Sequence, residues 1–109
     1  MATETSYALY IKDQLSGSGK VEVNKMFGEY GVYLEGKFVA VLCDNVFYLK
    51  HIPEVVPYLT EVLEGPPYKG AKPWYIIEQT DDREYLQKIV EITYHALPEP
   101  KPKKEKKKG

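Results

Sequence analysis

Residues that commonly build metal or redox centres are scarce in this sequence of 109 residues. The single cysteine, Cys43, has no partner for an intrachain disulfide and excludes a cysteine-rich zinc site. The two histidines, His51 and His95, lie far apart in the chain, and neither has a second histidine at metal-ligand spacing. We therefore expect no metal and no cofactor, and we interpret Cys43 as a small apolar residue of a strand.

Long apolar runs are also missing. The longest uninterrupted run, residues 38–43, is far shorter than the roughly 18 residues that a membrane span needs. The polar start, residues 1–5, does not have the pattern of a signal peptide. These features predict a soluble, cytoplasmic protein with no membrane contact. A mass of 12.5 kDa suits one domain, and a hydrophobic content of 43% is sufficient for a core.

Charge is distributed unevenly along the chain. Residues 99–109 contain six lysines and two glutamates, a net charge of +4, which leaves −5 for residues 1–98 out of the total of −1. This end has no aromatic or branched apolar side chain, and Pro98, Pro100 and Pro102 disfavour a helix. We expect a domain over residues 1–97 and a disordered tail rich in proline and lysine over 98–109.

The tail has two interpretations. It can be a solubilising extension, or it can be a polybasic arm for nucleic acid or another acidic partner, with Lys101, Lys103 and Lys104 among its contacts. The acidic domain weakens the second interpretation, because it repels the same phosphates.

Hydrophobic periodicity predicts a helix followed by a meander of strands. Apolar residues recur at helical spacing over residues 4–15, where Thr3 can serve as the cap, and a Ser/Gly segment ends the helix. The pattern then changes to that of strands. Tight turns at Glu35-Gly36 and Asp44-Asn45 favour antiparallel hairpins. The strands are expected at residues 21–27, 32–34, 37–43 and 46–50.

The second half of the chain predicts two more helices and one more strand. A helix over residues 54–63 is compatible with Pro57 only if this proline lies in its first turn. Residues 74–78 predict a strand, and a last helix starts at Asp81, which forms a capping box with Glu84, and extends to residue 97. Helices and strands in this order predict an α+β fold, an antiparallel meander sheet with an N-terminal helix and two later helices packed on it.

The central strand is apolar on both faces. Simple alternation puts Phe38, Ala40 and Leu42 on one side and Val39, Val41 and Cys43 on the other. Both faces of the sheet therefore need cover. Three short helices can supply it, or the sheet can self-associate, which makes a homodimer a possible assembly.

Catalytic patterns are weak, and one segment suggests binding. Glycines near residue 28 are not followed by a helix, so they lack the context of a phosphate-binding loop, and they favour a bulge or turn. Between Tyr68 and Tyr75, lysines alternate with aromatic residues, a combination that can neutralise phosphate and stack bases. The candidate surface for nucleic acid or a partner comprises Lys69, Lys72, Trp74 and Tyr75.

A motif in the first half of the chain carries a family resemblance. Residues 25–40 read KMFGEYGVYLEGKFVA, and DNVFYLK follows at 44–50. This sequence resembles the N-terminal domain of the TfoX/Sxy competence regulators, and Lys72-Pro-Trp-Tyr75 and the last helix look similar to that family too. Glu29 stands where the family often has a small residue. The motif residues, to which we assign a structural role, are Met26, Phe27, Gly28, Tyr30, Gly31 and Gly36.

The resemblance implies an α+β domain similar to secretion-chaperone-like folds, often dimeric and found in the bacterial cytoplasm. It offers no catalytic residues. We therefore expect a non-enzymatic binding or regulatory module, related to regulators of transcription, whose protein partner is unknown. The alternative is a nucleic-acid-associated protein that uses the basic tail and residues 68–75, and a small enzyme is the third possibility.

Overall fold

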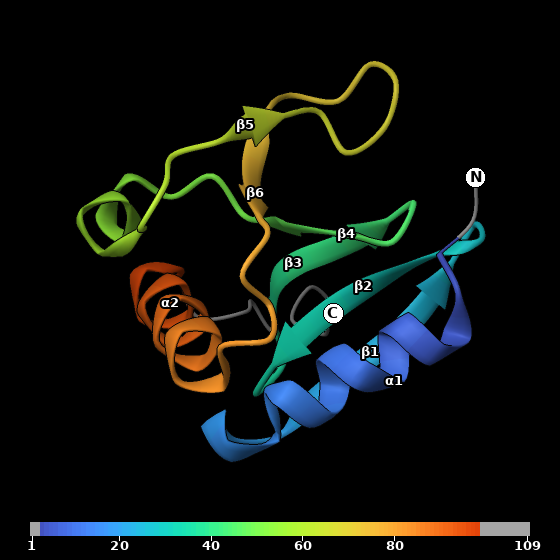
Figure 1. The fold of residues 1–109 in the computed structure, drawn as a ribbon, viewed down its shortest axis with the longest axis horizontal. Helices are drawn as coiled ribbons and strands as arrows, with labels where there is room; N and C mark the ends of the chain where they lie inside the picture. Colours follow the sequence, from blue (N-terminus) through green and yellow to red (C-terminus); the bar gives the residue numbers. More distant parts are fainter. Residues whose placement is uncertain (1–2, 99–109) are drawn as a thin grey trace, which may run out of the picture.

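The computed structural model describes residues 3–98 and shows an α+β fold built on one open sheet (Figure 1). Six strands lie in the order β1-β2-β3-β4-β6-β5, and every neighbouring pair is antiparallel. The elements are α1 (Thr5–Gln14), the 3-10 turn η1 (Ser16–Ser18), β1 (Val21–Met26), β2 (Glu29–Leu34), β3 (Lys37–Cys43), β4 (Val46–Leu49), the 3-10 helix η2 (Pro53–Tyr58), β5 (Glu64–Gly65), β6 (Trp74–Ile77) and α2 (Arg83–Ala96).

Three two-residue turns connect the first four strands. The turns are Phe27-Gly28, Glu35-Gly36 and Asp44-Asn45, and all six residues have a positive φ between 50° and 86°. Two central residues with positive φ match the right-handed twist of the flanking strands, so each turn closes a hairpin directly. The predicted meander and its two turns at 35–36 and 44–45 are confirmed. Phe27, which the sequence placed in a strand, belongs to a third turn.

Both α-helices cover the same face of the sheet, below β3 and β4 in the view of Figure 1. Helix α1 packs on β1, and α2 packs on β3 and η2. The core lies between the helices and this face, and its fully buried side chains include Ile11, Phe47 and Ile89. Side-chain hydrogen bonds join the helical segments: Gln14 Nε2 donates to the Thr80 carbonyl at 2.8 Å, and Gln87 Nε2 donates to the Gln14 carbonyl at 2.8 Å.

The end of α2 is fixed by a buried lysine from the sheet. Lys37 Nζ donates to the carbonyls of Tyr94 at 3.1 Å and Leu97 at 2.9 Å, and it lies 4.2 Å from the centre of the Tyr94 ring. The last carbonyls of a helix lack intrahelical donors and carry partial negative charge, so a cation there both caps and stabilises the helix. Lys37 therefore attaches α2 to the start of β3.

Three local predictions are wrong. The helix expected over 54–63 is a 3-10 helix that ends at Tyr58, because Pro53 and Pro57 lack the N–H groups that an α-helix needs. Asp82 rather than Asp81 caps α2, accepting a hydrogen bond from the Tyr85 N–H at 3.1 Å. Thr3 does not cap α1: the N-cap residue is Glu4, and its side chain makes no capping hydrogen bond.

A β-bulge in β3 changes which of its side chains share a face of the sheet, and it corrects the prediction from simple alternation. Val32 pairs with Ala40 whereas Tyr33 pairs with Phe38, so Val39 is an extra residue opposite β2. Val39 therefore joins Ala40 in the core beneath the helices, and Phe38 turns to the opposite face.

Candidate functional site: a groove on the open sheet face

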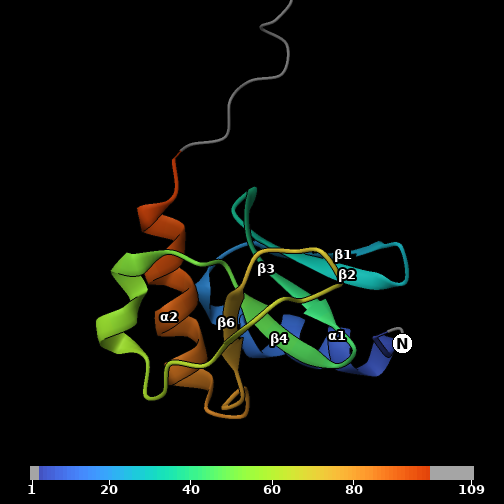
Figure 2. The ribbon, with the colours of Figure 1, turned by 90° about the horizontal axis from the view of Figure 1, so that it is seen from above.

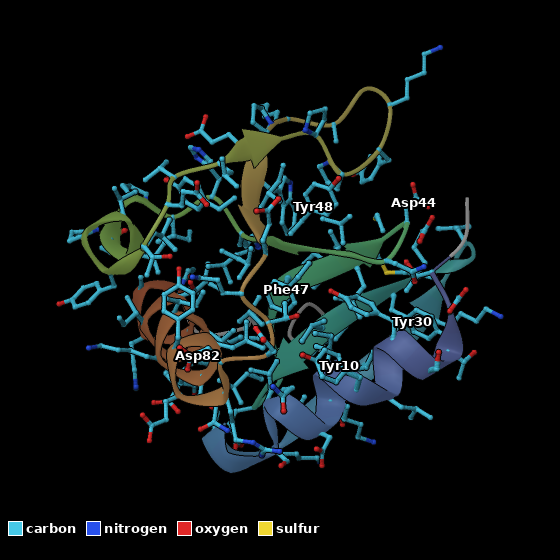
Figure 3. All side chains as sticks on the ribbon, in the orientation of Figure 1. Tyr10, Tyr30, Asp44, Phe47, Tyr48 and Asp82 are labelled. Atoms are coloured by element: carbon cyan, nitrogen blue, oxygen red, sulfur yellow. The ribbon has the colours of Figure 1, made fainter. Side chains whose placement is uncertain are left out.

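The face of the sheet opposite the helices is also apolar. Side chains alternate along each strand, and directly paired residues share a face, so the register defines this surface. Figure 3 shows the alternation in β4, where Phe47 and Tyr48 point to opposite sides. We call this surface the open face. Its residues on β2, β3, β4 and β6 include Tyr33, Phe38, Val41, Cys43, Tyr48, Trp74 and Ile76.

Aromatic rings cluster at one end of the open face. The ring centres of Tyr33 and Phe38 are 5.1 Å apart, and those of Phe38 and Trp74 are 5.9 Å apart in an edge-on arrangement. Lys50 Nζ lies 5.3 Å from the centre of the Phe38 ring. Ring pairs at these distances attract one another, and they hold three half-buried aromatic side chains in fixed positions without help from a helix.

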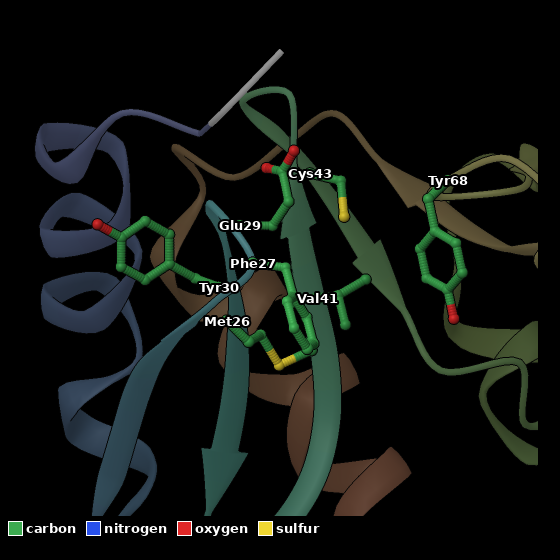
Figure 4. Close-up of a pocket in the computed structure, with 7 residues that line it drawn as sticks. All are labelled: Met26, Phe27, Glu29, Tyr30, Val41, Cys43 and Tyr68. Atoms are coloured by element: carbon green, nitrogen blue, oxygen red, sulfur yellow. The ribbon is translucent and has the colours of Figure 1, made fainter.

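A groove of about 490 Å³ occupies the other end of the open face (Figure 4). Val41 and Cys43 lie between its two walls. Tyr68, in the loop between β5 and β6, stands across from the β1–β2 turn. We call this hollow the Phe27 groove, and its lining is Met26, Phe27, Glu29, Tyr30, Val41, Cys43 and Tyr68.

Phe27 is held in an unusual conformation beside this groove. Its φ is 53°, in the left-handed region that residues other than Gly, Asn and Asp rarely adopt. Its side chain is fully exposed at 104% of the reference area, although an exposed aromatic ring forgoes the stabilisation of burial. The fold requires a positive φ at this position but does not require a phenylalanine.

A hydrogen-bonded cluster around Glu29 fixes the turn that carries Phe27. Glu29 Oε1 accepts hydrogen bonds from the Thr3 N–H at 3.0 Å, the Thr3 hydroxyl at 2.6 Å and the Asp44 N–H at 3.1 Å. The Thr3 N–H also donates to the Gly28 carbonyl at 3.2 Å. The Glu29 carboxylate therefore ties Thr3 to the turn at Phe27-Gly28 and to the turn at Asp44-Asn45.

The groove is uncharged at its floor and acidic on one wall. The pKa of Cys43 is raised to about 11, first by burial and then by the carboxylates of Glu29 and Asp44. The thiol is consequently neutral at physiological pH and is a poor nucleophile. Its burial agrees with the predicted apolar role of Cys43.

The structure does not assemble the predicted lysine and aromatic surface as one unit. Trp74 lies on the open face, whereas its neighbour Tyr75 is buried on the helix face, where it stacks on His51 with ring centres 4.3 Å apart. Lys69 and Lys72 are exposed on the loop between β5 and β6. Three further residues of the candidate surface, Lys101, Lys103 and Lys104, lie outside the described residues.

Three of the six residues of the family motif line the groove. Met26 and Phe27 line it, and the Tyr30 ring turns toward α1, where its hydroxyl is 3.1 Å from the Thr5 hydroxyl (Figure 4). Gly31 lies on the open face, and a Cβ there would be 3.1 Å from the Phe38 ring and 3.2 Å from the Met26 sulfur. Only glycine fits this point without displacing these side chains. Gly28 and Gly36 occupy turns at positive φ.

Sequence reasoning gave Phe27 a structural role and missed its place in a groove. A bulky apolar residue directly before the glycine of a hairpin turn was the available signal, because such turns favour Asn or Asp there.

Other chemistry is sparse between residues 3 and 98. No group of three His, Cys, Asp or Glu side chains in this part of the chain could hold a metal ion. No helix among these residues is both long and apolar enough to cross a bilayer. A second hollow, of about 600 Å³, extends from Tyr7 to the ends of β4 and β6, and burial raises the pKa of Tyr7 to about 12. We find no paired acid and base in its lining.

Comparisons with known proteins agree with the motif. The model of the TfoX N-terminal domain matches residues 13–97. A protein of Spirochaeta aurantia, described as an uncharacterized 12.7 kDa protein in the trpE 5′ region, is 38% identical over 109 residues, which cover 99% of this chain and 95% of that protein. The match spans every strand of the sheet.

Proposed function

Because the chain belongs to the TfoX N-terminal domain family, we propose that it is a non-enzymatic binding or regulatory module that acts through protein–protein contacts on the open face. One observation carries this proposal: a fully exposed Phe27, held at positive φ, lines an apolar groove on the sheet face that neither α-helix of residues 3–98 covers. Anchors of protein interfaces are commonly aromatic residues that fill pockets, surrounded by side chains that exclude water.

The remainder of the open face supports the same assignment. Its aromatic cluster of Tyr33, Phe38 and Trp74 is pre-arranged by ring contacts, so little side-chain entropy is lost when a partner covers it. The Cys43 thiol at the groove floor is neutral, because burial raises its pKa to about 11, so this part of the face presents no charge to a partner.

The test uses the substitution Phe27→Asn in a co-purification from native cells. Asn tolerates positive φ, so the turn is retained while the ring is lost. The matched control is Leu9→Asn, which removes an exposed apolar side chain from α1, away from the groove. We expect the wild type and Leu9→Asn to retain a protein that Phe27→Asn does not retain. The same protein, once purified, should bind the purified wild type. Identical capture by all three would refute the proposal.

Non-specific association with nucleic acid is the second candidate. The contact between Lys50 and Phe38, beside Trp74, is the observation in its favour, because cations and rings on one face can bind phosphate and stack bases. The net charge of −5 on residues 1–98 opposes it. We expect at most weak binding to random single strands and duplexes, lost at raised salt and on removal of residues 99–109. Salt-resistant binding without the tail would place this function first.

A further inference from the structure

The aromatic cluster at the end of the open face is an apolar surface that neither α1 nor α2 covers. Tyr33, Phe38 and Trp74 are half-buried, and their ring contacts and strand pairing place all three on this face. Surfaces lined by aromatic rings bind proline-rich segments, because the extended polyproline helix is already formed and loses little entropy on docking. The cluster therefore suits a ligand rich in proline.

This chain contains such a segment itself. Residues 98–102 read Pro-Glu-Pro-Lys-Pro, and we call them the proline segment. Three prolines in five residues favour the polyproline conformation, because the proline ring fixes φ near the value that this helix needs. Pro98 is exposed and is the last of the described residues, so the remainder of the segment lies outside them.

The proline segment starts next to the cluster. The carbonyl of Leu97 accepts a hydrogen bond from Lys37 Nζ at 2.9 Å, and Lys37 directly precedes Phe38 in β3. Leu97 lies on the helix side of the sheet and the Phe38 ring on the other, and the layers on two sides of a sheet are roughly 10 Å apart. A polyproline chain advances about 3.1 Å per residue, so about three residues pass the ends of the strands and reach the rings.

A lysine at the same end of the sheet matches the acidic residue of the segment. Lys50 directly follows β4, its N–H donates to the Val39 carbonyl at 2.9 Å, and its Nζ lies 5.3 Å from the centre of the Phe38 ring. A polyproline helix has three residues per turn, so Glu99 and Pro102 share one edge while Lys101 points elsewhere. One edge of the segment therefore offers a carboxylate to Lys50 and a proline to the rings.

Charge elsewhere around the cluster is balanced. Glu22 pairs with Tyr33 and shares its face, and Lys20 Nζ lies 3.8 Å from the Glu22 carboxylate in an exposed ion pair. These two charges largely cancel for a ligand that approaches Tyr33, so Lys50 supplies the directional charge at this end of the face.

We propose that the proline segment docks on the aromatic cluster of its own chain, with Pro100 and Pro102 on the rings of Phe38 and Trp74 and Glu99 beside Lys50. The docked segment covers one end of the open face and competes with a partner that binds there. Only this competition rests on the proposed function. The docking is a property of the isolated chain and is tested without a partner.

Tethering sets the expected strength of the contact. A short tether gives an effective local concentration of about 1 mM, so a segment with an intrinsic dissociation constant of about 1 mM is docked in roughly half of the molecules. Two proline rings bury little apolar surface, so we expect no tighter contact. Docking in half of the molecules weakens the apparent affinity of a competing partner about two-fold, and it leaves the stability of the domain nearly unchanged.

Acrylamide quenching of tryptophan fluorescence measures the cover directly, because Trp74 is the single tryptophan of the chain. The full chain is compared with chains lacking residues 99–109 or 104–109, at about 1 µM, where segments of other molecules do not bind. Removal of 99–109 should raise the quenching constant by up to about two-fold, as expected for a ring that is covered in half of the molecules. Removal of 104–109 is the matched control: it deletes four of the six lysines, keeps the proline segment and should leave quenching as in the full chain.

A charge exchange tests the orientation of the segment. Lys50→Glu should raise the quenching constant of the full chain, because Glu99 is then repelled, and Glu99→Lys in the same background should restore the protection. Each full-length variant is compared with the same background without residues 99–109, which removes any direct effect of residue 50 on Trp74. Far-UV circular dichroism confirms that every chain is folded.

Equal quenching of the full chain and of the chain without residues 99–109 would overturn the docking. Loss of protection on removal of residues 104–109 alone would also overturn it, because the lysines rather than the prolines would then make the contact. If capture of a protein still depends on Phe27 in either case, the proposed function stands without this inference. Protection of Trp74 together with identical capture by the wild type and Phe27→Asn would refute the proposed function alone.

Discussion

The two faces of the sheet are built from the same kinds of residue but are completed differently. On the helix face, Phe47 and Leu49 are fully buried in the core that lies between the sheet and the helices. On the open face, Tyr48 from the same strand and Trp74 from β6 remain half-buried, and neither α1 nor α2 lies on that side of the sheet (Figure 1). Figure 2, viewed at right angles to Figure 1, shows α2 beside the sheet and the residues of the β5–β6 loop crossing near β4. Both faces of the sheet are thus apolar, but the α-helices pack on only one of them.

This difference separates stability from recognition within one sheet. The helix face is filled, so changes in side-chain volume there act on folding. The open face keeps aromatic side chains at a water-accessible surface, where changes act mainly on association. Adjacent residues of one strand can therefore have unlike roles.

The largest expected effect compares Phe47→Ala with Tyr48→Ala. Phe47→Ala should lower the free energy of unfolding by about 3–5 kcal/mol, because it leaves a cavity in the core. Tyr48→Ala should lower it by only about 1 kcal/mol, since its ring already contacts water. Urea unfolding of both variants at low protein concentration measures the difference. Equal losses would show that the open face is as much a part of the core as the helix face.

The next effect concerns the lysine that fixes the helix layer. Lys37→Met retains the buried stem but removes the donors to the Tyr94 and Leu97 carbonyls. We expect a loss of about 2 kcal/mol, since buried acceptors are left without these charged donors. Lys88→Met, which removes only an exposed contact between the Lys88 ammonium and the Tyr58 ring, is the control and should change stability by no more than about 1 kcal/mol. Hydrogen exchange should show the loss first at the end of α2, and an unchanged exchange pattern there would argue against an anchoring role.

The pH dependence of stability tests how well the floor of the groove is shielded from water. The pKa of Cys43 is raised from 9.0 to about 11 in the folded protein, so the unfolded thiol ionises first as pH rises. Its stabilising contribution is complete below pH 9 and is lost toward pH 11; at pH 10 the loss is about 1 kcal/mol. Urea unfolding at pH 8 and pH 10 should show this decrease in the wild type and a smaller one in Cys43→Ala. Thiolate absorbance appearing near pH 9 in the folded protein would contradict the shielding.

The smallest expected effect is that of deleting the lysine-rich end of the chain. Deletion of residues 99–109 should change the free energy of unfolding by less than about 1 kcal/mol, because this segment has no branched apolar or aromatic side chain to bury. Thermal unfolding of the full and shortened chains provides the comparison. A larger loss would show that these residues pack on the domain.

The sequence predicted the sheet well because its signals are local. Alternation and paired turn residues at 35–36 and 44–45 determine a hairpin without reference to the rest of the chain. The bulge at Val39 was not predictable in this way, because it is a property of how β3 pairs with β2 and leaves the turn residues unchanged. The helix expected to reach residue 63 failed because the backbone effect of two prolines outweighed an apolar pattern.

The candidate site was predicted only in part. The sequence correctly placed Val41 and Cys43 together on one face of the central strand; that this face needs cover stays a prediction. The site itself combines Phe27, Val41 and Tyr68, which come from a turn, a strand and a loop that only the folded chain brings together. The sequence also grouped Trp74 and Tyr75 in one candidate surface, and this was wrong. Neighbouring residues of a strand point to different faces of the sheet, so these two side chains do not form one surface.

The hydrogen bonds that join the two helical segments have a consequence for the order of folding. These two hydrogen bonds connect residues that are separated by 66 and by 73 positions in the chain. The first three hairpins, in contrast, pair residues that are close in the chain. Closing a long loop requires more entropy to be lost before any contact forms. We therefore expect the meander to be structured in the folding transition state and Gln14 to dock on its partners afterwards, so that weakening this junction accelerates unfolding and leaves the refolding rate nearly unchanged.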